Sequence, residues 1–233
     1  MRTERFAAAT GAVYVVAVLF GNEMANAGAT GQDNDAGILA DLQRPRTAVN
    51  TVGMVMEILG MGLLIVFIGY LYRVLRRAEG PDGWWAAPAF GAGLVMVTVK
   101  LASAAPILAG RLRAHELTPE LARTLNNLNG AAFVVTGFAF GIFVLAAAAA
   151  ALVGRVLPRW LSIVGVVLGV LTVAAGTAGI LDPQGYVPIP FLLGLLWVAA
   201  FSILLTVRRS PPGNGRPSAD AASSVPTGAA ASA

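Results

Sequence analysis

The chain has 233 residues, of which 57% are hydrophobic and only 12% are charged, and its mean hydropathy is +0.73. Soluble globular chains carry about 25% charged residues. A soluble core could not bury this much apolar surface, and too few charges remain to cover it. The composition therefore excludes a soluble globular protein and predicts an integral membrane protein.

Single residue counts exclude several classes of site. The chain has no cysteine, which excludes disulfides, iron–sulfur clusters, thiolate metal sites and cysteine nucleophiles. The one histidine, His115, excludes bis-histidine haem and multi-histidine metal sites. The net charge is +4, but the arginines stand in small groups at the ends of apolar runs, as topology signals do. We therefore expect no metal, no cofactor and no nucleic-acid partner.

Long stretches with few charges divide the chain into expected membrane spans. A spanning helix needs about 20 mostly apolar residues, and the period-two alternation of barrel strands is absent. The pattern predicts an all-α bundle of six transmembrane helices within residues 1–209, at about 6–25, 47–73, 84–110, 124–154, 158–181 and 186–207. The tail, 210–233, is rich in Pro, Gly, Ser and Ala, and we expect it to be disordered.

The first stretch has a second interpretation. Arg2 and Arg5 form a positive N-terminal region, residues 7–20 form an apolar core, and the small residues around Ala27 are typical of a cleavage site. A cleaved signal peptide is therefore an alternative to a first transmembrane helix. We favour the helix because five further spans follow and because Glu23 suits an outer interface.

The arginines also predict the orientation of the bundle. With the N-terminus inside, the inner segments hold Arg2, Arg5, Arg73, Arg76, Arg77, Arg155, Arg159, Arg208, Arg209 and Arg216, and the outer segments hold Arg44, Arg46, Arg111, Arg113 and Arg123. Basic residues accumulate in short loops on the cytoplasmic side. We therefore expect both termini in the cytoplasm.

Two outer loops are expected. The first, about 27–46, holds three aspartates and a short apolar patch, and we interpret it as a solvated acidic loop; its segment 33–37 resembles part of a calcium loop but lacks the later ligands. In the second loop, Thr118 and Pro119 are typical of an N-cap and a first helical residue.

Two opposite charges lie deep in the expected spans. Glu57 is ten residues past the outer end of the second helix, and Lys100 is ten residues before the outer end of the third. Both are therefore about 15 Å deep in a core of about 30 Å. Consecutive helices are normally antiparallel neighbours, and an isolated charge at this depth costs at least about 2.5 kcal/mol. We therefore predict a salt bridge between Glu57 and Lys100. It either takes part in binding a ligand or a proton, or only fixes the register of the two helices.

Polar side chains continue from this pair toward the outer side. Asn50 lies on the second helix, and Asn126, Asn129 and Thr136 lie on the fourth. Together with Glu57 and Lys100 they predict a polar cavity that opens outward, and these six residues are the candidate ligand-binding residues. Two GxxxG pairs, Gly137–Gly141 and Gly165–Gly169, favour close helix packing.

Three segments resemble an uncharacterised bacterial family of six-helix membrane proteins, one of the domain-of-unknown-function families. They are VNTVGMVMEILG around Glu57, LPRWLSIVG at 157–165, and a glycine-rich fifth helix followed by a short outer loop. In that family the third helix carries a basic residue where Lys100 stands, with an acidic residue soon after; here Ser103 and Ala104 follow instead. The resemblance implies the fold and a place in the bacterial inner membrane, but no activity.

Three classes of function remain open. The first is a bundle that handles a lipid or small molecule in the outward cavity, and the second is a structural or accessory protein that packs against a membrane-protein partner in the lipid bilayer. The third is an enzyme, for which His115 with Glu116 or Glu120 forms no triad. Transport is the weaker form of the first class, because we find no internal repeat and because Pro88 and Pro106 lie near the ends of the third helix.

Overall fold

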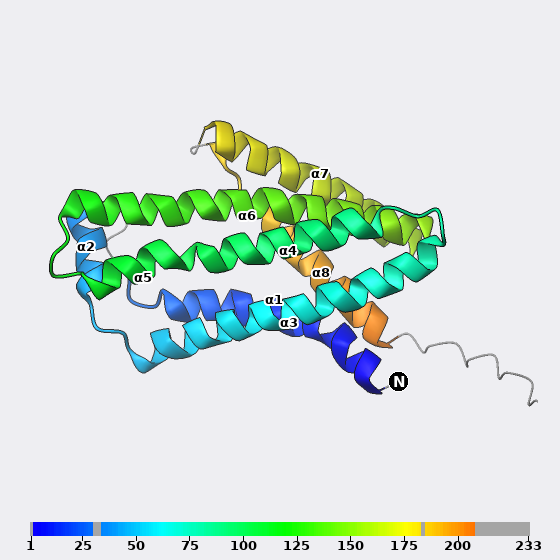
Figure 1. The fold of residues 1–233 in the computed structure, drawn as a ribbon, viewed down its shortest axis with the longest axis horizontal. Coiled ribbons are helices and arrows are strands. Elements are labelled where there is room, and N and C mark those ends of the chain that lie inside the picture. Colours follow the sequence, from blue (N-terminus) through cyan, green and yellow to red (C-terminus); the bar gives the residue numbers. More distant parts are fainter. Residues whose placement is uncertain (1, 30–33, 183–184, 208–233) are drawn as a thin grey trace, which may run out of the picture.

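The computed structural model describes residues 2–29, 34–182 and 185–207, and over these residues its regular structure is helical (Figure 1). The helices are α1 (Arg2–Ala25), α2 (Asp35–Gln43), α3 (Ala48–Glu79), α4 (Ala86–Ala102), α5 (Ala104–Leu112), α6 (Pro119–Val153), α7 (Arg159–Leu181) and α8 (Ile189–Val207). Six stretches of the described chain are long and apolar enough to span a membrane: α1, α3, α4 with α5, α6, α7 and α8. The prediction of an all-α six-helix bundle is confirmed.

The bundle has two distinct ends. The start of α1 and the end of α8 lie at the same end, as an even number of spans requires, and α2 lies at the opposite end (Figure 1). We call these the N-terminal end and the α2 end. The α2 end is the one expected to face outward. The predicted disordered tail, 210–233, and Asp33 lie outside the described residues.

Helix α6 begins five residues before its predicted limit, because a capping group and a polar first turn continue it past the apolar core. Thr118 Oγ1 accepts a hydrogen bond from Leu121 N, and Pro119 is the first residue of α6, as the sequence predicts. Thr47 caps α3 in the same way, in a reciprocal capping box with Asn50. At its other end α3 runs to Glu79, six residues past its predicted limit.

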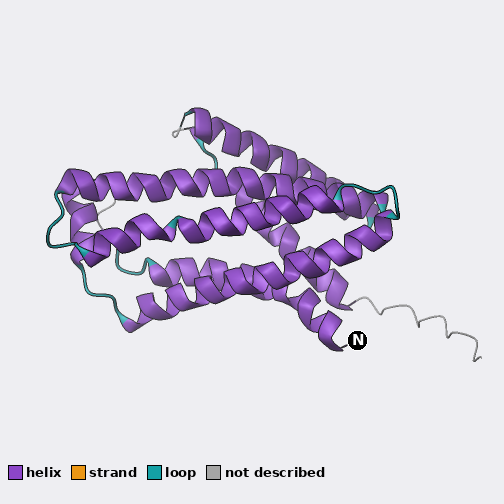
Figure 2. Ribbon diagram, viewed as in Figure 1, coloured by secondary structure: helices purple, strands orange, loops and turns teal. Residues whose placement is uncertain are grey.

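The predicted third helix forms one apolar span, Ala86–Leu112, whose helical hydrogen bonding lapses at a single residue. α4 ends at Ala102 and α5 begins at Ala104, with Ser103 between them (Figure 2). Pro106 is the cause: it has no N–H to donate to Ala102, and its ring crowds that carbonyl. The interruption lies three residues beyond Lys100, well inside the span.

The first outer loop also differs from its prediction. Residues 35–43 form the short helix α2, which begins at a cap in which Asn34 Oδ1 accepts from Gly37 N. Its apolar side chains Ile38 and Leu42 are buried in a small cluster with Ala114 and Ala122. The loop is therefore a short helix packed on α5 and α6, and its exposed residues are Ala36, Ala40 and Gln43.

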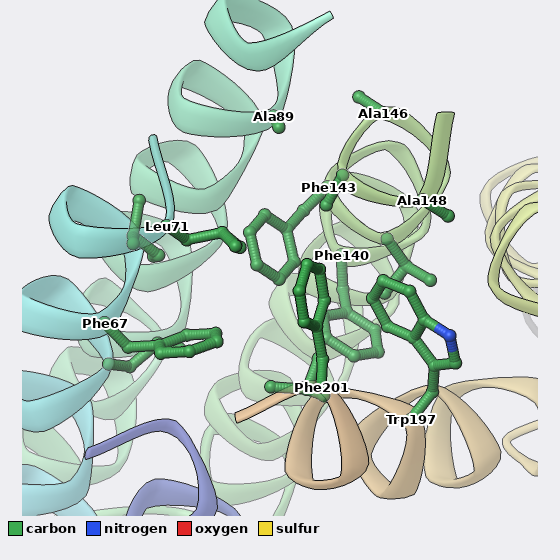
Figure 3. Close-up of a cluster of buried hydrophobic side chains, with 14 of the residues drawn as sticks. Phe67, Leu71, Ala89, Phe140, Phe143, Ala146, Ala148, Trp197 and Phe201 are labelled. Atoms are coloured by element: carbon green, nitrogen blue, oxygen red, sulfur yellow. The ribbon is translucent and has the colours of Figure 1, made fainter. Parts of the chain in front are cut away.

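The main core fills the N-terminal half of the bundle. Side chains from α3, α6 and α8 converge there, among them Phe67, Phe143 and Phe201 (Figure 3). Trp197 packs beside Phe201 and donates its ring N–H to the Leu161 carbonyl, at 2.9 Å. A run of alanines on α6 between residues 146 and 151 lets neighbouring helices approach closely. This half of the molecule is therefore apolar and tightly packed.

Glycines mark a close crossing between α6 and α7. A Cβ on Gly141 would lie 2.6 Å from Val173 N, and a Cβ on Gly169 would lie 2.5 Å from Leu145 N. Gly165 lies against both Trp197 and Ala148 of α6, whereas Gly137 faces the Tyr186 ring. Both glycines of the second GxxxG pair therefore serve the α6–α7 crossing, but only Gly141 of the first pair does.

Helix α1 is joined to α8 by an unusual pair of hydrogen bonds. Ser202 Oγ donates to the Ala8 carbonyl, at 2.5 Å, and accepts from Ala12 N–H, at 2.8 Å. The hydroxyl thus bridges the carbonyl and the N–H at the two ends of one turn of α1. α1 also packs extensively along α3, so it is an integral part of this bundle.

Candidate functional site

A cavity of about 560 Å³ lies in the half of the bundle nearer the α2 end. This volume falls within the range of about 300–1,000 Å³ that is typical of small-molecule sites. Residues of α1, α2, α3, α4, α5, α6 and α8 line it. All six candidate residues are brought together in its wall: Asn50, Glu57, Lys100, Asn126, Asn129 and Thr136.

The predicted ion pair between Glu57 and Lys100 is confirmed. Lys100 Nζ lies 2.9 Å from Glu57 Oε1, and the two side chains are 24% and 20% exposed. Lys100 also lies above the Phe133 ring, with Nζ 5.9 Å from its centroid. Among the described residues, no donor is aligned for a hydrogen bond to Glu57 Oε1. The pair is therefore close and mostly buried, yet part of it faces the cavity.

Two facing glycines place Glu57 against α1. A Cβ on Gly53 would lie 2.4 Å from Ala25 N, and one on Gly21 would lie 2.9 Å from the Gly53 carbonyl oxygen and 3.1 Å from Glu57 N. The backbones of α1 and α3 therefore touch directly one turn before Glu57. This contact fixes the turn of α3 that carries the carboxylate.

Asn50 has a structural role that the sequence did not reveal. Its Nδ2 donates to the carbonyl oxygens of Met24, Ala25 and Ala27, at 3.0–3.2 Å. Its Oδ1 accepts from both the backbone N–H and the hydroxyl of Thr47. One side chain thus caps the end of α1 and the start of α3, and its hydrogen-bonding groups are already engaged.

The other polar candidates differ in what they leave for a ligand. Asn129 Nδ2 donates to the Ser103 carbonyl, at 2.7 Å, and so bridges the interruption between α4 and α5. Thr136 Oγ1 donates to the Ala132 carbonyl of its own helix, at 2.8 Å. The side chain of Asn126 makes no hydrogen bond to another described residue. Its amide is therefore the most available neutral group in the lining.

Three arginines line the mouth of the cavity, and our interpretation of the sequence assigned them only to topology. They are Arg44, Arg46 and Arg111, with Glu23 and Asp41 near them in the lining. Arg111 Nη1 donates to the Arg44 carbonyl, at 3.3 Å, whereas Arg111 Nε is buried and, among the described residues, has no acceptor. Arg44 and Arg46 shortly precede the helix that carries Glu57, and Arg111 follows the apolar stretch that carries Lys100. This placement in the sequence is the signal that could have identified them.

The floor of the cavity is apolar. It is formed by Tyr14, Met61, Met96, Phe133, Phe191 and Leu195. Phe133 contacts Phe191 edge-on, with ring centroids 5.4 Å apart, and it contacts Tyr186 in the same way from behind. Burial raises the pKa of the Tyr186 hydroxyl above its ordinary value. The lining therefore changes from arginines at the mouth, through the ion pair, to hydrocarbon at the floor.

The remaining outer-loop residues lie apart from the cavity. His115 is exposed, and Glu116 forms an exposed ion pair with Arg113, at 3.4 Å. Asp35 pairs with Arg123, which fastens α2 to α6. The cavity thus combines polar, cationic and apolar surfaces. Comparisons with family models, with curated proteins and with solved structures found no match.

Proposed function

We propose that this multi-pass membrane protein binds a lipid or small molecule in the cavity, and that the ligand enters from the α2 end. One observation carries the proposal: a space of about 560 Å³ is open around an intramembrane ion pair. Intramembrane ionisable residues cost free energy and usually mark functional sites. We further propose the bacterial inner membrane as the location, with the α2 end outside, and membership of the six-helix family named above.

The surroundings of the pair favour a ligand over a role in helix register alone. A pair that only fixes register is best enclosed by close packing, because its charges then interact most strongly. Here both side chains keep about a fifth of their surface exposed, and the cavity adjoins them.

The test is to fill the cavity and measure binding. Gly130 lines the cavity, and a Cβ on it meets nothing within 4 Å, so Gly130→Phe should fold while occupying the space. Gly91→Phe is the matched control, because Gly91 is equally unobstructed but lies outside the lining. The probes are three amphiphiles with the same oleoyl chain: lysophosphatidylglycerol, lysophosphatidylcholine and monoolein. Native mass spectrometry counts the molecules retained by the detergent-solubilised protein.

We expect the wild-type protein and Gly91→Phe to retain one molecule of at least one probe, and Gly130→Phe to retain about tenfold less. Equal retention by all three proteins would place binding elsewhere on the surface. Retention of no probe by the wild-type protein would also overturn the proposal, and would favour a structural role with a membrane-protein partner.

A further inference from the structure

The cavity lining also indicates which class of ligand it suits. Resting on the proposed function, we infer that the ligand is an anionic amphiphile. Its phosphate or carboxylate head group binds the arginines at the mouth, and its apolar chain extends past the ion pair to the floor. The inference is carried by the charge balance of the lining, by one buried guanidinium nitrogen, and by the order of polar and apolar surfaces along the cavity.

The charge balance of the lining is positive, and the excess lies at the mouth. Among the described residues of the lining, Arg44, Arg46, Lys100 and Arg111 are cationic, and Glu23, Asp41 and Glu57 are anionic. Glu57 neutralises Lys100, and Asp41 Oδ1 lies 3.3 Å from Arg44 Nη2. Asp41 also acts on Arg111, and Glu23 is the third carboxylate, so the described lining keeps one net positive charge at the mouth, which favours an anion over a neutral or cationic head group.

Arg111 offers the specific contact. Its Nε is buried and, in the described structure, lacks an acceptor, while Nη1 makes one long hydrogen bond of 3.3 Å to the Arg44 carbonyl. A buried donor without an acceptor is unfavourable. A guanidinium group matches the paired oxygens of a phosphate or carboxylate, since Nε and one Nη donate in parallel. An anionic head group would satisfy this donor.

The length of the cavity indicates that the ligand has an apolar part as well as an anionic head group. Arg111 is eleven residues past Lys100, which corresponds to about 16 Å along the helices. Below the pair, Met61 and Met96 each lie one turn deeper, beside Tyr14 and Leu195. A free phosphate would contact only the mouth and leave this apolar floor without a partner. A single long hydrocarbon chain would contact it.

The experiment compares head groups on one chain. Competition by native mass spectrometry uses oleoyl-lysophosphatidylglycerol (anionic), oleoyl-lysophosphatidylcholine (zwitterionic), monoolein (neutral) and glycerol 3-phosphate (the free head group). We expect the wild-type protein to prefer the anionic lysolipid over monoolein by about tenfold, the ratio expected for one charge-assisted pair of hydrogen bonds. Glycerol 3-phosphate at the same concentration should not compete.

Two variants test whether the arginine carries the preference. Arg111→Gln keeps a side-chain donor but removes the charge, and should reduce the preference to less than about threefold. Arg113→Gln is the control, because Arg113 lies two residues away, is exposed and is outside the lining. It should keep the wild-type ratio. Equal thermal unfolding midpoints of the two variants would show that both fold.

Each other outcome has a defined meaning. Equal binding of the anionic and neutral probes, still abolished by Gly130→Phe, would overturn this inference and leave the proposed function standing. An unchanged ratio in Arg111→Gln would also overturn it. Competition by glycerol 3-phosphate would identify a soluble phosphate compound as the ligand and overturn the amphiphile. Loss of all specific binding would overturn the proposed function itself.

Discussion

Glu57 and Lys100 stabilise each other only as a pair, and this is measurable. Each charge lies about 15 Å deep, so removing one partner leaves the other at high cost in hydrocarbon. We expect Glu57→Gln and Lys100→Met each to lower the free energy of unfolding by about 2 kcal/mol. The double variant should recover at least about 1 kcal/mol of the summed loss. The measurement is a thermal-unfolding cycle in detergent.

The exposed pair of Arg113 and Glu116 is the natural control for this cycle. Its side chains are 76% and 70% exposed, and pairs of this kind contribute little because water screens them. Glu116→Gln should therefore leave the unfolding midpoint unchanged. Strictly additive losses for Glu57 and Lys100 would show that the two side chains do not interact.

At the scale of elements, the α6–α7 crossing makes a second prediction. Gly141→Ala would place a Cβ 2.6 Å from the Val173 backbone, which cannot move aside without displacing α7. We expect a loss of about 1–3 kcal/mol, the usual cost of overpacking. Gly62→Ala is the control, because nothing lies within 4 Å of a Cβ there. Equal unfolding midpoints of the two variants would mean that the crossing is looser than described.

Much of this architecture could be predicted from the sequence because membrane spans and caps are local signals. Thr118 and Pro119 predicted the start of α6. The depths of Glu57 and Lys100 were predicted by counting residues along the apolar runs. Helix α2 was missed because nine residues are too few to show a helical period. The effect of Pro106 was missed because its partner carbonyl lies toward the middle of the span.

The candidate site was predicted less completely than the fold, for a physical reason. Asn50 could be placed on the inward face from its position, but its bonds to Met24, Ala25 and Ala27 join two helices and depend on how they pack. The arginines at the mouth are explained by the positive-inside count alone, so the sequence by itself did not require them in a binding site. Contacts between distant segments are set by tertiary packing, and no local pattern encodes them.

At the scale of the whole molecule, orientation and access to the cavity can be tested together. The chain contains no cysteine, so single-cysteine variants need no further changes. We expect Asn126→Cys to react in intact cells with the membrane-impermeant anion 2-sulfonatoethyl methanethiosulfonate, because Asn126 lines the cavity. Thr98→Cys should stay unreactive, since this exposed residue of α4 faces lipid beside Lys100.

Trp160→Cys completes the experiment. Trp160 is 66% exposed at the start of α7, at the N-terminal end, so it should react only after the cells are permeabilised. Reaction of Trp160→Cys but not Asn126→Cys in intact cells would mean that the bundle has the opposite orientation. Reaction of Asn126→Cys as slow as that of Thr98→Cys would mean that the cavity is closed.

The unequal filling of the two halves has an electrical consequence. Water that enters the polar cavity keeps the electrical potential near Lys100 close to that of the solution at the α2 end. The membrane voltage therefore falls mainly across the packed half, around Phe67, Phe143 and the alanines of α6. Moving a unit charge through the whole field involves about 2.3 kcal/mol per 100 mV. A charge reaching the mouth or the ion pair crosses little of that field, so occupancy of the cavity should be nearly independent of voltage.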